Sequence, residues 1–178
     1  MTIDKNELKK LIRDIPGFPK EGIVFRDITP LLSNAAGLAA AVRMMADPFR
    51  DKRIELVVGA ESRGFIFGTA IAMELNCGFV PIRKPGKLPA ATIEQEYELE
   101  YGTDKLEMHT DAVRAGQRVL IVDDLLATGG TMQACCAMVE KLAGEIVGIS
   151  FLIELTFLKG RKKLKGYEIH TIINYDNE

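Results

Sequence analysis

The sequence predicts an α/β fold in which helices flank a twisted, mostly parallel β-sheet. Apolar, β-branched runs alternate along the chain with segments of helical periodicity, and this alternation is typical of parallel strands joined by crossover helices. The predicted strands are ELVVG (55–59), GFVPI (78–82), RVLIVDD (118–124) and EIVGISFLI (145–153). The predicted helices between them cover residues 64–75 and 130–142.

Length and charge limit the function classes. A chain of 178 residues is expected to form one domain, over residues 1–178. With 23 basic and 25 acidic side chains, the net charge of −2 argues against nucleic acid as a partner, because such proteins need a basic excess. We find no apolar run of about 18 residues and no signal-peptide core, so we expect no membrane association and a cytoplasmic location. The three cysteines suggest neither disulfides nor a zinc site.

The N-terminal part is predicted to begin with a helix. Asp4 and Glu7 have the spacing of a capping box, and an apolar stripe from Leu8 to Ile15 continues to the turn at Pro16. Residues 17–30 (GFPKEGIVFRDITP) combine turn formers with apolar side chains, which indicates an ordered loop. A second helix is expected from about 34 to 49.

Two segments interrupt the alternation of strands and helices. Residues 82–94 (IRKPGKLPAATIE) form a proline-punctuated loop, and residues 97–109 (YELEYGTDKLEMH) are predicted to be two short strands around a turn at 102–104. Long loops inside a compact domain are usually functional lids or disordered.

The strongest motif is VLIVDDLLATGGT (119–131), a buried strand that leads through a glycine-rich turn into a helix. Ligands of open α/β sheets bind beyond the carboxyl ends of the strands. A helix N-terminus next to Gly129 and Gly130 offers free backbone N–H groups and a positive dipole end, and the hydroxyls of Thr128 and Thr131 add donors. This arrangement suits a phosphate monoester.

Two acids in the same motif, Asp123 and Asp124, would repel that phosphate if they faced it. A few ångströms away they suit a pair of hydroxyls, so the motif as a whole fits a ribose 5-phosphate. The alternative is a metal-binding acid pair beside an ordinary glycine-capped turn. A Walker loop is excluded, because no Gly-Lys-Ser/Thr follows the glycines.

Two further segments could bind anions. VVGAESRGF (57–65) repeats the strand–turn–helix geometry and adds Arg63, whose guanidinium recognises oxygen pairs. IRKPGKLP (82–89) carries Arg83, Lys84 and Lys87 with no acid among them. Cations that close over a departing pyrophosphate would stabilise it and exclude water. The alternatives are a structural salt bridge for Arg63 and a solvated basic loop for the other three.

The motif at 119–131 resembles the phosphoribosyl pyrophosphate (PRPP) signature of the type I phosphoribosyltransferases. The resemblance implies that Asp123 and Asp124 hold the ribose hydroxyls and that Mg²⁺ arrives bound to PRPP, with few or no direct bonds to protein. The residues it assigns to the 5′-phosphate are Ala127, Thr128, Gly129, Gly130 and Thr131. Those it assigns to pyrophosphate are Ala60, Glu61, Ser62, Arg63, Arg83 and Lys87.

The chain resembles most closely the branch of that family that acts on adenine. The matching segments are 16–32, 59–65, 82–89, 99–109, 119–132 and 154–161 (ELTFLKGR). The resemblance implies the type I phosphoribosyltransferase fold, with an N-terminal helix and base-covering hood over residues 1–32 and a flexible lid loop and hairpin over residues 83–109. In the lid, Ala90 and Ala91 stand where many relatives have glycine or proline.

The same resemblance implies that the purine attacks the anomeric carbon of PRPP, giving AMP and pyrophosphate. Adenine would stack on Phe25, with backbone groups of Val24 and Arg26 along its polar edge and Leu155 on its other face. Phe25 as core packing is the alternative. Glu100 would handle the purine proton, with Tyr101 as a helper, unless Glu100 only pairs with a loop lysine. A homodimer is also implied, in which Arg83 could act at the pyrophosphate site of its own subunit or reach that of the partner.

Two other functions remain open from the sequence. The substrate could be an oxopurine or a pyrimidine in place of adenine. The protein could also be a PRPP-sensing regulator without turnover, although no DNA-reading helix-turn-helix and no large basic face is visible. Turnover of adenine with PRPP distinguishes these possibilities.

Overall fold

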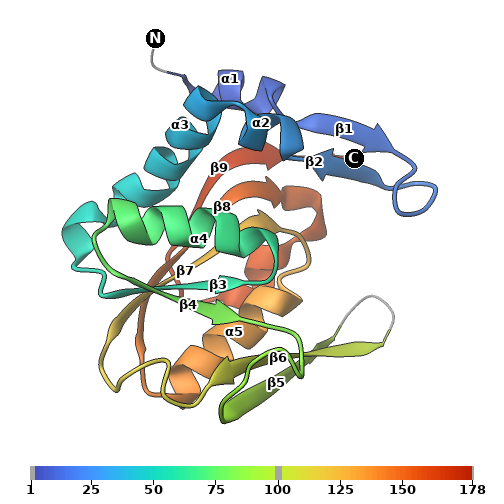
Figure 1. Ribbon diagram of the computed structural model, residues 1–178. Helices are drawn as coiled ribbons and strands as arrows, with labels where there is room; N and C mark the ends of the chain where they lie inside the picture. Colours follow the sequence, from blue (N-terminus) through green and yellow to red (C-terminus); the bar gives the residue numbers. More distant parts are fainter. Residues whose placement is uncertain (1–2, 99–101, 178) are drawn as a thin grey trace.

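The computed structural model describes residues 3–98 and 102–177, and its centre is a five-stranded sheet (Figure 1). All neighbouring strands are parallel, in the order β4-β3-β7-β8-β9. The strands are β3 (Leu56–Ala60), β4 (Gly78–Ile82), β7 (Arg118–Leu126), β8 (Glu145–Leu155) and β9 (Ile169–Tyr175). The predicted α/β fold with a mostly parallel sheet is confirmed.

Helices cover both faces of this sheet. On one face, α3 (Ala35–Ala46) and α4 (Arg63–Glu74) bury side chains in a cluster that contains Val57 and Leu120. On the other face, α5 (Gly130–Lys141) packs in a second cluster with Val58 and Ile121. Successive strand residues therefore alternate between two apolar cores, which explains why these strands read as continuous apolar runs.

The predicted boundaries are accurate where apolar runs end at turn residues. Strand β4 matches its prediction residue for residue, α4 is shifted by one residue at each end, and α5 ends one residue earlier than predicted. Strand β7 continues two residues beyond the prediction because Leu125 and Leu126 keep their pairing with β8. The edge strand β9 had no counterpart in the sequence analysis, which assigned no element to the C-terminal segment.

The N-terminal helix is shorter than predicted. Helix α1 (Lys5–Lys10) begins with the expected capping box, in which Asp4 accepts from the Glu7 N–H and the Glu7 carboxylate accepts from the Asp4 N–H. The prediction that the helix continues through Ile15 is wrong. Residues after Ile12 form β1 (Arg13–Pro16), which pairs antiparallel with β2 (Val24–Asp27), and the partner strand overrides the helical spacing.

The second helix, predicted from about 34 to 49, is also shorter than predicted. A short helix, α2 (Thr29–Ser33), precedes α3, and α3 ends at Ala46. Residues 47–49 were expected to be the end of this helix. They instead begin a 3₁₀ helix, η1 (Asp47–Lys52), in which Pro48 occupies the first turn. Proline lacks the N–H that would continue the α-helix. Two further 3₁₀ turns, η2 (Thr156–Leu158) and η3 (Gly160–Leu164), follow β8.

The predicted hairpin is present but differently placed. Strands β5 (Thr92–Glu98) and β6 (Thr103–His109) pair antiparallel over seven residues each. The first strand therefore begins five residues before the predicted start, and the predicted turn at 102–104 is wrong at Thr103 and Asp104, which lie in β6. A backbone bridge between Arg83 and Glu107 joins this β5–β6 hairpin to the end of β4.

No helix within residues 3–98 and 102–177 is long and apolar enough to cross a membrane. The three cysteines, Cys77, Cys135 and Cys136, carry free thiols.

Candidate active site

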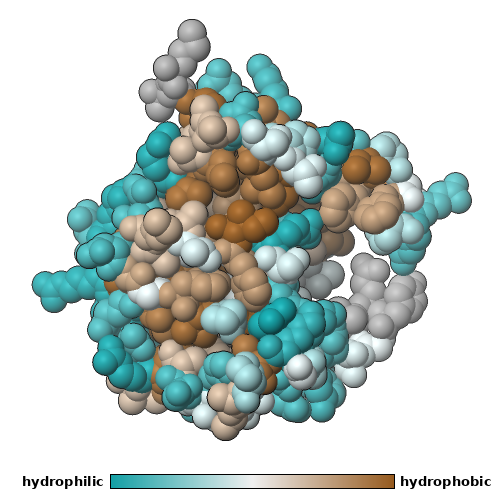
Figure 2. Space-filling view, viewed as in Figure 1, coloured by the Kyte–Doolittle hydropathy of each residue, from teal (hydrophilic) through white to brown (hydrophobic). Residues whose placement is uncertain are grey.

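A cavity of about 490 Å³ opens where β3 and β7 end, beside the β5–β6 hairpin. Figure 2 shows the surface hollowed on this side of the molecule. The cavity brings together three of the predicted segments: the turn after β3, the basic loop after β4 and the glycine-rich turn after β7. It is lined by Glu61, Ser62, Arg63, Lys84, Tyr97, Leu106 and residues 123–132.

The glycine-rich turn presents the N-terminus of α5 to the cavity. Gly129 is the N-cap residue with a φ of 83°, and within the described part of the chain no side chain caps the helix. The first N–H groups of α5 are thus available to an anion. A methyl group at Gly129 would lie 2.6 Å from the carbonyl oxygen of Gly160, and one at Gly130 would lie 2.9 Å from that of Glu98. Both positions therefore need glycine.

The two acids near the carboxyl end of β7 lie beside this turn at the wall of the cavity. The Asp124 N–H donates to Asp123 Oδ1 (2.9 Å), and Asp124 Oδ2 lies 2.9 Å from Arg63 Nε. Burial, together with the charge of Asp124, raises the pKa of Asp123 well above its usual value. Burial also raises the pKa of Asp124, and the Arg63 guanidinium partly offsets this. Two carboxylates with raised pKa values in one cleft, one of them buried and the other partly buried, are typical of a functional site.

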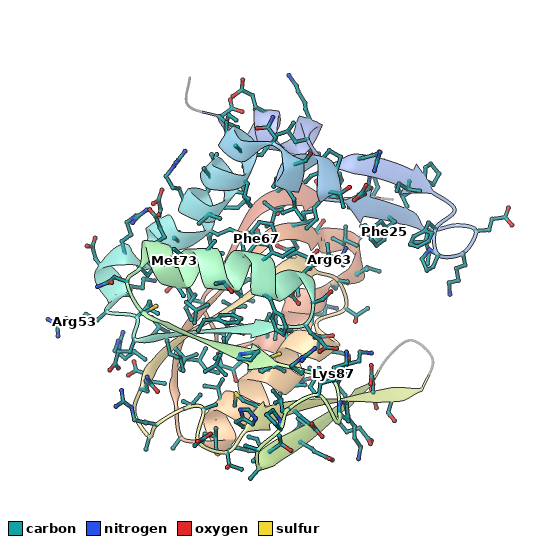
Figure 3. The ribbon with its side chains drawn as sticks, in the orientation of Figure 1. Phe25, Arg53, Arg63, Phe67, Met73 and Lys87 are labelled. Carbon is teal, nitrogen blue, oxygen red and sulfur yellow. The ribbon has the colours of Figure 1, made fainter. Side chains whose placement is uncertain are left out.

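Helix α4 also points its N-terminus at this acid pair. A methyl group at Gly64 would lie 2.9 Å from Asp123 Oδ1, so the first turn of α4 packs directly on the end of β7. Arg63, in the same turn, reaches Asp124 with its Nε and lies with its guanidinium 5.3 Å from the centre of the Phe25 ring. Figure 3 shows Phe25 and Arg63 close together at the β1–β2 side. Arg63 thus connects the acid pair with the β1–β2 hairpin.

The basic loop has acidic partners that the local sequence does not reveal. Arg83 Nε lies 2.9 Å and Lys87 Nζ 2.5 Å from the carboxylate of Glu61. Lys84 Nζ lies 2.5 Å from Asp104 Oδ2. These side chains are therefore paired with acids, while those of Lys84 and Lys87 remain 52% and 47% exposed to solvent. Among the described residues that line the cavity, Lys84 is present whereas Arg83 and Lys87 are not.

The pyrophosphate candidates after β3 fall into two groups. Glu61, Ser62 and Arg63 line the cavity. Ala60 is fully buried as the last residue of β3 and packs in the core with Ile82. The peptide bond between Glu61 and Ser62 is cis.

The adenine candidates lie beside the cavity, outside its lining. Phe25 meets Phe18 edge to face (5.2 Å between ring centres) and belongs to neither apolar core. The Arg26 side chain is buried against Asp14 (2.6 Å) and the Tyr175 ring, so only its backbone is available. Leu155 is half-buried at the end of β8. Glu100 and Tyr101, assigned to proton transfer, lie outside the described residues.

Two residues of the site had no assigned role in the sequence analysis. Tyr97 of β5 lines the cavity, and its hydroxyl lies 3.3 Å from Asp104 Oδ2. Gly160 packs its backbone against the glycine-rich turn, where a methyl group would lie 2.3 Å from the carbonyl oxygen of Ala127. Both contacts depend on long-range packing. The only available signal for Gly160 was its place in the matching segment 154–161.

Comparisons with known proteins agree with this geometry. A family model described as "Phosphoribosyl transferase domain" matches residues 27–176. The adenine phosphoribosyltransferase of Halothermothrix orenii is 57% identical over 94% of this chain and 98% of its own. The crystal structure of the enzyme of that name from Thermoanaerobacter pseudethanolicus is similar with a TM-score of 0.94 and 55% identity, covering 96% of this chain and 99% of that one.

A third similar protein has a ligand. The adenine phosphoribosyltransferase of Saccharomyces cerevisiae, solved in complex with adenine and an imino-altritol bisphosphate, superposes with a TM-score of 0.90 at 41% identity. The superposition covers 94% of this chain and 97% of the yeast chain. The family model covers most of the chain, and the relatives named here that are 55–57% identical over nearly the full length are adenine phosphoribosyltransferases. The chain therefore belongs to the phosphoribosyltransferase family and, within it, to the adenine phosphoribosyltransferases.

Proposed function

We propose that this chain transfers ribose 5-phosphate from PRPP to adenine, giving AMP and pyrophosphate, which is a reaction of purine salvage. The observation that carries the proposal is the cavity, where the free N-terminus of α5, the acid pair near the end of β7 and Arg63 converge. These groups match the three parts of PRPP: a phosphate monoester, a diol and a pyrophosphate. The transfer inverts the anomeric carbon, because the purine attacks opposite to the leaving pyrophosphate.

We assign the 5′-phosphate to the turn 127–131 and the ribose hydroxyls to Asp123 and Asp124. The free N–H groups and the dipole of α5 support the first assignment. The second is supported by the position of the two carboxylates at the cavity wall, where hydroxyl donors would satisfy their acceptor oxygens. Ser62 and Arg63 are assigned to the pyrophosphate, with Arg83 and Lys87 closing on it.

The β2 strand offers a backbone edge for the base. Pro16 lies opposite Val24, and the Gly17 N–H donates to the Ile23 carbonyl (2.8 Å). Hydrogen-bonded and non-bonded pairs alternate in an antiparallel ladder, so the pair of Pro16 and Val24 is non-bonded. The N–H and C=O groups of Val24 and Arg26 therefore point to the open edge of β2. One donor and one acceptor there would distinguish the exocyclic amine of adenine from an oxo group, with Leu155 on the other face of the base.

Magnesium would enter as the PRPP complex. Within the described residues, no three His, Cys, Asp or Glu side chains gather into a metal site, and Asp124 is already paired with Arg63. We expect a Mg²⁺ whose ligands are mainly diphosphate oxygens and water. When bound, the ion would neutralise charge on the departing pyrophosphate. The chain's own contribution is to hold the two phosphate ends and the ribose.

The function is tested by incubating radiolabelled adenine with the protein, PRPP and Mg²⁺ and measuring AMP. Hypoxanthine, xanthine and orotate in parallel reactions test the substrate. If any of these compounds is consumed faster than adenine, that compound and not adenine is the substrate base. The absence of pyrophosphate release with every base would favour the regulator that binds PRPP without turnover.

We expect Phe25→Leu to weaken adenine use while leaving PRPP use intact. Stacking of a base on an aromatic ring contributes about 1–3 kcal/mol, so the KM for adenine should rise about tenfold or more. Leucine keeps the apolar volume but removes the ring face. Steady-state kinetics with each substrate varied in turn measures the effect. The KM for PRPP is the internal control, and an equal rise in both constants would contradict the stacking assignment.

Proton transfer is assigned to Glu100, a residue outside the described part of the chain. Its carboxylate would accept the imidazole proton that the purine loses as the new bond forms. Glu100→Gln should therefore lower kcat about a hundredfold, because positioned acid–base groups contribute about 10²–10⁴. Adenine affinity, measured by calorimetry, should change little. A large loss of affinity with unchanged kcat would make Glu100 a binding residue.

We also propose a homodimer. The support is an apolar surface over α3 and α4, visible as brown and tan colouring across the centre of Figure 2. On α4, Met73 is 79% and Ile66 40% exposed, and Leu38 and Val42 of α3 line a groove beside Met73. Apolar patches of this kind mark interaction sites. Size-exclusion chromatography with light scattering tests the assembly, and a monomer at micromolar concentration would contradict it.

A further inference from the structure

A carboxylate occupies a position where the leaving pyrophosphate is expected to bind. Glu61 follows β3 directly and lines the cavity, and its side chain is only 8% exposed. It lies in the same turn as Ser62 and Arg63, which we assign to pyrophosphate. A negative side chain at the centre of an anion site is unexpected, because like charges at short range repel.

Glu61 holds two of the three cations of the basic loop. Its Oε2 lies 2.9 Å from Arg83 Nε, and its Oε1 lies 2.5 Å from Lys87 Nζ. The guanidinium of Arg83 also donates to the Lys87 carbonyl (3.4 Å), so the two cations are held together. Among the described residues, Glu61 lines the cavity and both of its cationic partners stand outside the lining. Glu61 therefore contacts these cations and also lines the cavity.

The same carboxylate is ionised at neutral pH. Burial alone would raise the pKa of Glu61, but hydrogen bonds from Lys87, Arg83 and the Lys84 N–H outweigh it and hold the pKa below its usual value. The charge of Glu61 thus offsets one of the two positive charges that it contacts before any substrate arrives. Lys84 is paired elsewhere, with Asp104.

We propose that Glu61 competes with pyrophosphate for Arg83 and Lys87 and thereby promotes release of the product. This inference rests on the proposed function. When PRPP binds, the two cations turn from Glu61 to the diphosphate oxygens and stabilise the charge that develops on the leaving group. After the bond breaks, Glu61 recaptures them and pyrophosphate leaves. Glu61 is then a positioning residue for the two cations, which differs from the sequence-based expectation that it binds pyrophosphate itself.

The two roles of Glu61 predict opposite effects of one substitution. Glu61→Gln keeps the size and the hydrogen-bond acceptor but removes the charge. If Glu61 competes with pyrophosphate, the variant should bind pyrophosphate about tenfold more tightly, a ratio equivalent to about 1.4 kcal/mol. Calorimetric titration of magnesium pyrophosphate into the protein without AMP measures this directly. Product inhibition by pyrophosphate against PRPP should become stronger by the same factor.

A matched control and a second variant separate competition from a general change of charge or fold. Glu168→Gln removes one negative charge from an exposed pair with Lys52 at the amino end of β9, far from the cavity, and should leave pyrophosphate affinity unchanged. Lys87→Gln should weaken pyrophosphate binding more in the Glu61→Gln background than in the wild-type protein. This difference arises because Glu61 neutralises Lys87 in the wild type.

Unchanged or weaker pyrophosphate binding by folded Glu61→Gln protein would overturn the proposal. If circular dichroism shows that this variant is unfolded, Glu61→Asp replaces it, because the shorter side chain cannot reach both cations and should also tighten binding. Failure of the proposed function gives a different result. In that case wild-type protein makes no AMP from adenine, whereas the comparison of pyrophosphate affinities can still be made.

Discussion

Replacing Asp123 and Asp124 together with asparagine is expected to lower kcat/KM for PRPP at least about a hundredfold. Hydrogen bonds to charged groups contribute about 1.5–3 kcal/mol each, so the loss of two corresponds to about 3 kcal/mol or more. Both carboxylates lie at the cavity wall beside the turn 127–131, where they would meet the ribose hydroxyls. Steady-state kinetics with PRPP varied at saturating adenine measures the loss.

The control for this double variant is Asp51→Asn, a change of the same chemistry at an exposed position in η1. It should leave the PRPP kinetics unchanged. Circular dichroism should show both variants folded. PRPP kinetics equal to those of the wild type in the double variant would contradict the assignment of the ribose site.

Asp123→Asn alone is expected to stabilise the ligand-free protein at pH 7. Because the pKa of Asp123 is raised in the folded protein, the neutral carboxyl favours folding and the ionised carboxylate opposes it. The stability that the neutral form provides is lost as the pH rises through the folded-state pKa. Asparagine avoids this cost and still accepts from the Asp124 N–H. We expect a gain of about 1 kcal/mol, or about 3 °C in Tm, that shrinks as the pH falls toward 3.8, the ordinary value for Asp. Thermal melts over this range measure it.

This pairing of higher stability with lower activity would show that the acid pair is maintained for substrate binding. Natural sites often keep such unfavourable charges for function. A fall in Tm for folded Asp123→Asn would instead indicate that the carboxylate supports the fold, for example by its place beside the first turn of α4.

The parts of the molecule that the sequence predicted are those determined by local patterns. The glycine-rich turn, its acid pair and the strands around it depend on neighbouring residues, and the structure places them together at one cavity. The end of α1 was mispredicted because Ile15 has helical spacing, whereas its pairing with Phe25 in β1–β2 determines its conformation. Local periodicity carries no information about such a partner strand.

The charge pairs of the site could not be predicted for the same reason. Glu61 and Arg83 are 22 residues apart, and Lys84 and Asp104 are 20 apart. The basic loop contains no acid of its own, so the sequence suggested free cations. The fold brings one acid from the end of β3 and another from β6, and this changes the expected role of Glu61 from ligand to competitor.

Gly129→Ala is the second substitution with a large expected effect. Gly129 combines a φ of 83° with direct backbone packing, since the new methyl group would lie 2.6 Å from the Gly160 carbonyl oxygen. Backbone atoms cannot yield as a flexible side chain can, so the turn 127–131 or the segment that begins at Gly160 must shift. We expect the KM for PRPP to rise at least about tenfold, because a displacement of about 1 Å in a binding constellation can cost a hundredfold.

Gly166→Ala separates the two causes of this effect. Gly166 has a φ of 97°, and no described atom lies within 4 Å of the position of its Cβ. Alanine there incurs only the backbone strain of about 1–3 kcal/mol, which should lower Tm and leave the KM for PRPP unchanged. If Gly129→Ala lowers Tm by no more than Gly166→Ala does and the variant binds PRPP normally, the contact with Gly160 does not position the turn 127–131. Both glycines have a positive φ, but only Gly129 packs against the backbone of Gly160. A selective loss of PRPP binding in Gly129→Ala would therefore make the contact between Gly129 and Gly160 part of the substrate site.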